Sequence, residues 1–68
     1  MNNTVYKSIE ITGTSAESIE DAVNGAIAKA GQTVRQMRWF EVIETRGVID
    51  SNQVKQWQVT IKIGFSLE

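Results

Sequence analysis

Residues 57–67 read Trp-Gln-Val-Thr-Ile-Lys-Ile-Gly-Phe-Ser-Leu, and this stretch shows most clearly which side of the protein is its core. Apolar side chains alternate with polar ones or glycine, which is the two-residue period of a β-strand with one buried face. We predict a strand over 54–67. Its apolar row should face the core, and Gln58 should face outward.

The first segment of the chain has the same period. Residues 4–12 predict a strand in which Ile9 and Ile11 point to the core and Tyr6 points outward.

A longer strand is predicted over 37–49, with a hairpin loop at 50–53 in which Asn52 can take a left-handed conformation. Strict alternation places one set of its side chains on the core side: Phe40, Val42, Glu44, Arg46 and Val48. The same alternation places the other set on the outer face: Trp39, Glu41, Ile43 and Thr45.

A helix is predicted between the first two strands. Thr14-x-x-Glu17 fits a capping box, with Ser15 as an equally good cap. Apolar residues recur at intervals of three and four over 16–34, which is typical of an amphipathic helix with one buried stripe. We expect the helix to end near Thr33.

The element order β-α-β-β indicates the α+β class. A strand-helix-strand unit joins parallel strands, so the hairpin partner fits best between them, in a three-stranded antiparallel sheet of order 1-3-2 wrapped on one helix. We expect a single domain over residues 1–68. The outer face carries Trp39, Ile43 and Tyr6 among polar side chains, so we expect a closed homo-oligomer that covers it.

Composition excludes several classes of function. The 68 residues contain no Cys and no His, so we expect no disulfide, no metal site and no histidine-based catalysis. Seven basic and eight acidic residues without a basic cluster argue against nucleic acid as a partner. No stretch is apolar enough to suggest a membrane partner, and we expect a cytoplasmic protein with no catalytic residues.

Six short segments, in this order and spacing, resemble the dodecins, a family of small flavin-binding proteins. They are Val5-Tyr6-Lys7, Gly13-Thr14-Ser15, Trp39-Phe40-Glu41-Val42, Arg46-Gly47, Gln58-Val59 and Gly64-Phe65. The resemblance spans essentially the whole chain and implies a hollow homododecamer. It also implies flavins bound in pairs, stacked between Trp side chains of symmetry-related subunits.

The resemblance also implies which residues bind the cofactor. Trp39 matches the stacking Trp, Gln58 matches the glutamine that hydrogen-bonds the flavin ring edge, and Arg46 matches an arginine near the phosphate. Thr45 and Gly47, on either side of Arg46, are grouped with them. FMN is the expected cofactor, with riboflavin or FAD as alternatives, and coenzyme A is left open as a further ligand.

Two positions complicate the resemblance. Ser66 stands where several bacterial members have Arg, which puts a second phosphate contact, and with it a preference for FMN over riboflavin, in doubt. Trp57 lies on the core side by alternation, so we interpret it as a core residue rather than a second stacking residue.

The expected function is therefore non-catalytic: flavin storage or sequestration, with the indole quenching flavin photochemistry. The alternative is a structural, scaffolding homo-oligomer with no bound cofactor, in which Trp39 is only an interface residue. A small flavin-dependent reductase is a third and weaker hypothesis, because a flavin held between two indoles leaves little room for a substrate.

Overall fold

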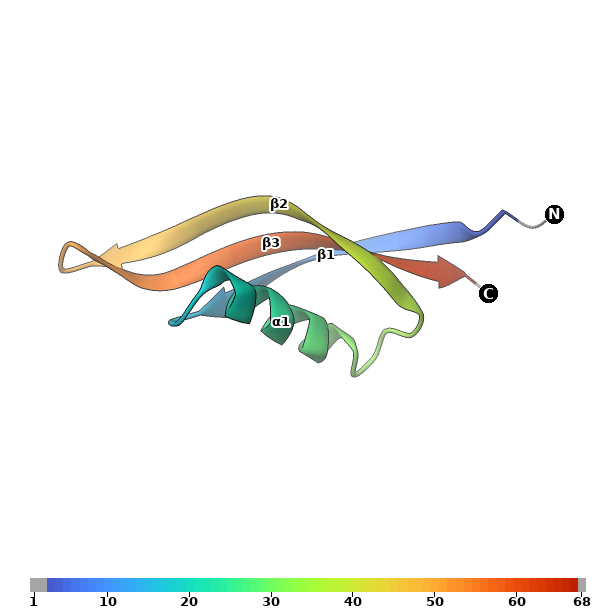
Figure 1. Cartoon of the computed structure of the whole chain (residues 1–68), viewed down its shortest axis with the longest axis horizontal. Helices are drawn as coiled ribbons and strands as arrows, with labels where there is room; N and C mark the ends of the chain where they lie inside the picture. Colours follow the sequence, from blue (N-terminus) through green and yellow to red (C-terminus); the bar gives the residue numbers. More distant parts are fainter. Residues whose placement is uncertain (1–2, 68) are drawn as a thin grey trace.

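A computed structural model of the chain describes residues 3–67, as three long strands and one helix (Figure 1). The elements are β1 (Val5–Ser15), α1 (Ile19–Ala30), β2 (Met37–Asp50) and β3 (Gln53–Leu67). The sheet order is β1-β3-β2 with both pairings antiparallel, which confirms the predicted fold class and strand order. Of the single domain expected over 1–68, Met1, Asn2 and Glu68 lie outside the described residues.

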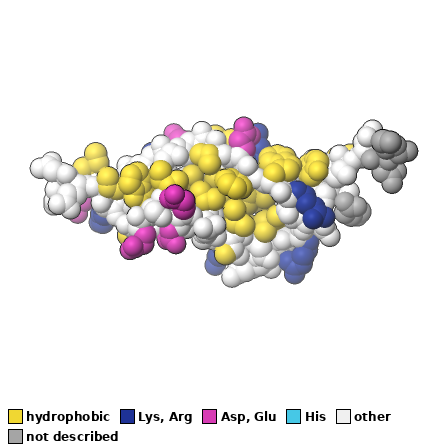
Figure 2. Space-filling model, in the orientation of Figure 1, with side chains coloured by type: hydrophobic (Ala, Val, Ile, Leu, Met, Phe, Trp, Pro, Cys, Tyr) yellow, Lys and Arg dark blue, Asp and Glu magenta, His cyan; other side chains and the backbone are white. Residues whose placement is uncertain are grey.

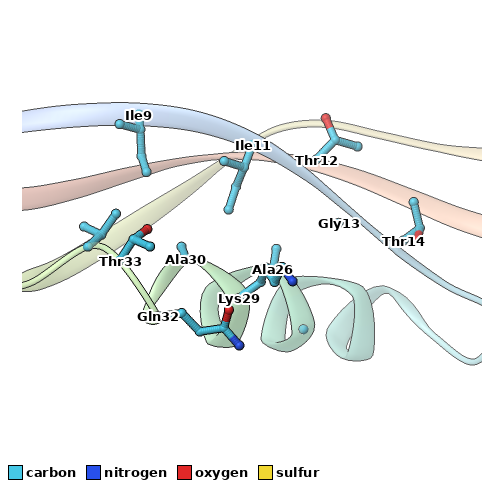
Figure 3. A pocket seen from close by; sticks show the side chains of 12 residues that line it. Ile9, Ile11, Thr12, Gly13, Thr14, Ala26, Lys29, Ala30, Gln32 and Thr33 are labelled. Atoms are coloured by element: carbon cyan, nitrogen blue, oxygen red, sulfur yellow. The ribbon is translucent and has the colours of Figure 1, made fainter.

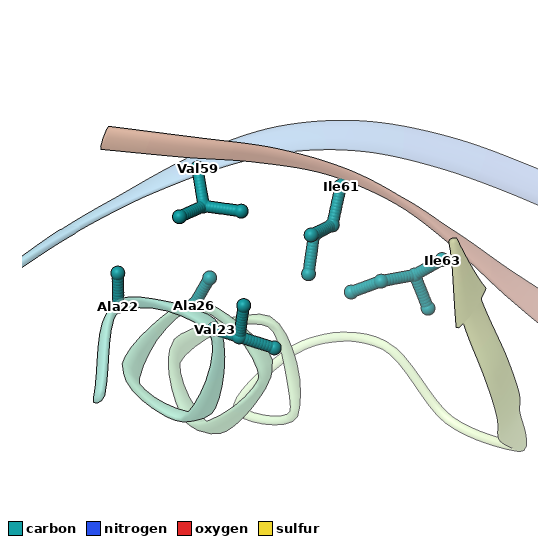
Figure 4. Packing of buried hydrophobic residues seen from close by; sticks show 6 residues of the cluster. All are labelled: Ala22, Val23, Ala26, Val59, Ile61 and Ile63. Atoms are coloured by element: carbon teal, nitrogen blue, oxygen red, sulfur yellow. The ribbon is translucent and has the colours of Figure 1, made fainter. Parts of the chain in front are cut away.

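The core lies between β3 and α1. Three side chains from the alternating row of β3 are almost completely buried: Val59, Ile61 and Ile63. They face three small or medium side chains of the helix, as Figure 4 shows: Ala22, Val23 and Ala26. The predicted core row of β3 is therefore correct in its central part.

The first strand also meets the helix as predicted. Ile9 and Ile11 point from β1 toward α1 (Figure 3) and pack against the core cluster.

The helix begins later than predicted, at Ile19. Its N-cap is Ser18, whose hydroxyl accepts a hydrogen bond from the backbone N–H of Asp21 at 3.0 Å. Ser15 instead ends β1, and its hydroxyl accepts from the Glu17 N–H at 2.8 Å and donates to the Asp21 carboxylate at 2.7 Å. The predicted capping box is wrong because Thr14 stays in β1, paired with β3.

The other end of the helix and the hairpin differ only slightly from the prediction. The helix ends at Ala30, and the Gly31 N–H bonds the Ile27 carbonyl at 2.9 Å, so the predicted end near Thr33 falls in the turn that follows. In the hairpin, Ser51 and Asn52 have φ angles of 53° and 62°. A two-residue turn with both φ angles positive suits the right-handed twist of the strands, and the left-handed conformation predicted for Asn52 is confirmed.

A β-bulge at Ile43 reverses the two faces of β2 beyond it, so that side chains expected on the helix side lie on the outer face and the other way round. Val42 pairs with Ile61 and Glu44 pairs with Thr60, so Ile43 has no partner on β3. One extra residue in a strand reverses the alternation beyond it.

The predicted faces are therefore wrong from residue 44 onward. Arg46 pairs with Gln58 and lies on the outer face, whereas Thr45 pairs with Val59 and lies on the helix side. Cross-strand partners share a face, which is why the pairing settles the placement. Before the bulge the predicted faces are correct.

The helix leaves much of the sheet uncovered. The molecule is 56 Å long, whereas a helix of 12 residues spans about 18 Å. Because α1 packs against β1 and β3, Phe40 and Val42 of β2 remain 48% and 46% exposed although they lie on the helix side. Phe40 therefore lies on the predicted side of the sheet, but its phenyl ring is not buried within the single chain.

Gly13 allows α1 to lie close to β1. A Cβ atom at this position would overlap the Ala22 carbonyl oxygen and would lie 2.9 Å from the Ala26 Cβ. The absence of a side chain at Gly13 therefore sets the distance between the helix and the sheet.

We expect Gly13→Ala to lower the free energy of unfolding by about 1–3 kcal/mol, because the added methyl group forces the helix away from β1. Gly25→Ala is the matched control, because Gly25 lies within α1 and has no atom within 4 Å of the added Cβ. Alanine favours the helix, so this control should gain up to about 1 kcal/mol. Urea unfolding at one fixed protomer concentration measures both. Equal effects of the two changes would contradict the close packing.

Candidate ligand-binding face

Trp39 lies on the outer face of the sheet, as predicted. A register shift between Met37 and Trp39 brings Trp39 opposite Gly64, and a Cβ atom at Gly64 would overlap the six-membered ring of the indole. The indole therefore lies directly over the backbone of β3, and 41% of the residue is exposed. Tyr6 meets it edge-on, with ring centroids 6.0 Å apart and an interplanar angle of 62°.

Ser66 is tied into the structure beside this aromatic pair. Its residue is only 5% exposed, and its hydroxyl accepts a hydrogen bond from Nε of Arg38 at 3.3 Å. Its backbone N–H donates to the Gln36 carbonyl at 3.0 Å. In place of the arginine found at this position in several bacterial members of the family that the sequence resembles, the chain has a buried hydroxyl that anchors the start of β2.

Three polar side chains form a hydrogen-bonded chain near the other end of the outer face. Nε of Arg46 donates to Oε1 of Gln58 at 2.7 Å. Nε2 of Gln58 donates in turn to Oε1 of Gln56 at 3.0 Å. Sequence alternation placed Gln58 correctly and Arg46 incorrectly, and it drew no attention to Gln56.

The indole and the amide do not meet within one chain. Trp39 lies over Gly64, and Gln58 is six residues from Gly64 along β3, which corresponds to roughly 20 Å in an extended strand. That separation exceeds the length of a three-ring aromatic system. One protomer therefore presents the indole and the amide as two separate candidate half-sites on the same face.

The remaining two predicted site residues lie on the opposite side of the sheet. Thr45 is opposite Val59 and Gly47 is opposite Trp57, which both belong to the helix-facing row of β3. Trp57 itself is half-buried and is not part of the central core cluster, because it lies at the end of the sheet where β1 ends.

Hydrophobic side chains form a band along the long axis of the face that Figure 2 shows. Large apolar residues are exposed on both sides of the sheet and at both of its ends. Among those at least 45% exposed are Val5, Tyr6, Phe40, Val42, Ile43, Ile49, Val54 and Leu67. Exposure on this scale is typical of a surface that another protein chain covers.

Two hollows at the surface of the single chain lie apart from the Arg46–Gln58 pair. One, of about 580 Å³, runs between β1 and α1 and is lined by residues that include Ile11 and Lys29 (Figure 3). A smaller one, about 160 Å³, borders Trp39 and Phe40. Within residues 3–67 there is no group of three or more acidic, His or Cys side chains placed to hold a metal ion. Nor does that part of the chain contain a helix long and apolar enough to cross a membrane.

We expect Gly64→Ala to displace the indole of Trp39, because the added methyl group occupies the position of its six-membered ring. In a Trp57→Phe background Trp39 is the only tryptophan, so its emission maximum and near-UV circular dichroism report the change directly. Gly25→Ala in the same background should leave both spectra unchanged, because its added Cβ meets no atom. Unchanged spectra for Gly64→Ala would show that Trp39 does not lie over Gly64.

Comparison with known proteins agrees with this architecture. The family model described as Dodecin matches residues 5–68. The chain is 48% identical over 64 residues to the dodecin of Thermus thermophilus, which covers 94% of this chain and 93% of that protein. It is 33% identical over 63 residues to the calcium dodecin of Mycobacterium tuberculosis, covering 93% and 89% respectively. The solved structure of dodecin from Streptomyces coelicolor superposes with a TM-score of 0.93 and 46% identity, covering 100% of this chain and 97% of that one. The chain belongs to the dodecin family.

Proposed function

We propose that this protein binds flavin without turning it over, and that it stores or sequesters the flavin in a closed homo-oligomer. The observation that carries the proposal is the exposed indole of Trp39, which is held over Gly64 on a face that the protomer itself leaves open. FMN is the proposed ligand, with riboflavin and FAD as alternatives.

The indole suits this role because of its electronic character. The isoalloxazine ring system is flat and electron-poor, and offset stacking on an electron-rich ring adds about 1 kcal/mol beyond the burial of area. A close indole can also donate an electron to photoexcited flavin, which quenches its emission and limits its photochemistry. Trp39 is 41% exposed beside Tyr6, so part of the indole surface is available for stacking.

The polar half-site comes from a second copy of the chain in this proposal. Gln58 has both a donor and an acceptor, and so matches the uracil-like edge of flavin. Because Gln58 and Trp39 are roughly 20 Å apart along one sheet, the ring system of one flavin cannot stack on Trp39 and hydrogen-bond Gln58 in the same protomer. A dodecamer, which we propose as the closed form, would bring the two half-sites together between copies.

Arg46 and its neighbours complete the proposed site. Nε of Arg46 is bound to Gln58, so the terminal nitrogens of the guanidinium are the donors available to the FMN phosphate. Thr45 and Gly47 belong to the helix-facing side of β2, so we assign only their backbone groups to contacts with the flavin. Such contacts are accessible because β2 is an edge strand of this sheet.

A scaffolding oligomer without cofactor is the alternative function. Its support is the exposure of Phe40 and Val42 on the helix side of β2, which indicates an interface independent of any ligand. Flavin titration separates the two proposals, because a scaffold would neither bind nor quench flavin.

We expect Trp39→Ala to lower riboflavin affinity by at least about 2 kcal/mol, roughly thirtyfold, through lost burial and stacking. Emission from flavin that still binds should rise, because the electron donor has been removed. Fluorescence titration of particles with verified size measures both effects.

Trp57→Phe is the matched control for this change. Trp57 is the second tryptophan of the chain and lies on the helix-facing row, so its replacement should alter stability and leave flavin affinity unchanged. If Trp39→Ala assembles and quenches flavin as well as the parent, flavin stacking on Trp39 is refuted and Trp57 becomes the candidate.

We expect the protein to form a particle of about twelve protomers by light scattering, with flavin sites shared between copies. Particles made of Trp39→Ala protomers alone, or of Gln58→Leu protomers alone, should bind riboflavin weakly. Particles assembled from a mixture of the two should regain a fraction of high-affinity sites, because an intact Trp39 of one copy meets an intact Gln58 of another. Size-checked mixtures that gain no binding, or a parent protein that stays monomeric at micromolar concentration, would refute the composite site.

A further inference from the structure

We propose that Gln56 is a positioning residue that holds the Gln58 amide in one of its two orientations, with Arg46 fixing the other end. The inference rests on the proposed flavin binding and deepens it, because it assigns the order in which the site presents its donor and its acceptor to the ligand.

The hydrogen-bonded chain has only one possible polarity. A guanidinium has N–H donors and no acceptor, so the Gln58 atom 2.7 Å from Nε of Arg46 must be its carbonyl oxygen. The amide nitrogen of Gln58 is then turned toward Gln56. Since that nitrogen donates, the Gln56 atom 3.0 Å away must be an oxygen, as the structure has it.

The backbone holds all three side chains in place. Arg46 lies directly opposite Gln58 on the neighbouring strand, and Gln56 precedes Gln58 by two residues on the same face of β3. Gln56 and Gln58 are both half-buried on the central strand. If the Gln58 amide turned over, its NH₂ would face the donor of Arg46 and its oxygen would face the oxygen of Gln56.

A fixed amide matters to a ligand that carries both kinds of group. The uracil-like edge of flavin has an N–H between two carbonyls, so it can pair with an amide through one donated and one accepted bond. The Gln58 amide presents its oxygen on the Arg46 side and its N–H on the Gln56 side. A flavin edge that meets it must therefore place N–H toward Arg46 and a carbonyl toward Gln56.

Three substitutions of Gln56 test the polarity with riboflavin, which is uncharged and so insensitive to the change in net charge. Gln56→Glu keeps an acceptor for the Gln58 amide, and we expect affinity within about twofold of the parent. Gln56→Leu removes the acceptor, and we expect a loss of about three- to tenfold, which corresponds to one hydrogen bond. Gln56→Lys places a donor against the Gln58 NH₂ and should bind more weakly than Gln56→Leu.

A double-substitution cycle separates positioning from a general structural effect. In a Gln58→Leu background, Gln56→Leu should change riboflavin affinity no further, because the amide that it positions is gone. Gln53→Leu, an exposed glutamine at the start of the same strand, is the matched control and should leave affinity unchanged. All variants are compared as particles of the parent's size.

Each outcome bears on the inference. Two results would overturn the positioning role. One is equal riboflavin affinity of Gln56→Glu and Gln56→Lys, and the other is an undiminished effect of Gln56→Leu in the Gln58→Leu background. Neither result would contradict the proposal that the protein binds flavin. If the parent protein fails to bind riboflavin at all, the proposed function is overturned and this inference with it.

Discussion

The central strand is the constraint on which the rest of the structure depends. β3 bonds to β1 on one side and to β2 on the other, while its buried row of Val59, Ile61 and Ile63 faces the helix. One short helix can cover only part of such a long sheet. Because Gly13 allows α1 to pack closely on β1 and β3, β2 beyond Met37 is left exposed, including Phe40 and Val42 on its helix side. Two exposed surfaces follow from this arrangement: the outer face of the sheet, which carries Trp39, and the helix side of β2, which carries Phe40.

The fold could be predicted from the sequence because it depends on two strong periodic signals. The alternation of β3 and the three- and four-residue spacing of the helix each extend over many residues, so local exceptions do not change the assignment. The helix start was missed because serine and threonine at several neighbouring positions can all cap a helix. Thr14 cannot cap the helix because it is paired with β3, and this pairing joins residues that are far apart in the sequence.

The candidate site was predictable only in part, and the bulge at Ile43 explains why. Trp39 precedes it and Gln58 lies on the regular strand, so alternation placed both correctly. Arg46 and Thr45 follow the bulge, and each was assigned to the wrong face. Ile43 is no glycine and carries no turn signal, so nothing in the local sequence marks the extra residue. Gln56 was missed for another reason: its role consists only of a hydrogen bond to a side chain two residues away.

The separation of the indole from the amide along one sheet has a thermodynamic consequence for a protein whose sites form between copies. If the proposed flavin sites form between copies, ligand affinity and protomer association are linked quantities, since each bound flavin would also hold two subunits together. Dilution would release ligand, and free flavin would draw dispersed subunits into particles. The amount of bound flavin would then rise more steeply with protein concentration than it would for independent sites that are each complete within one chain.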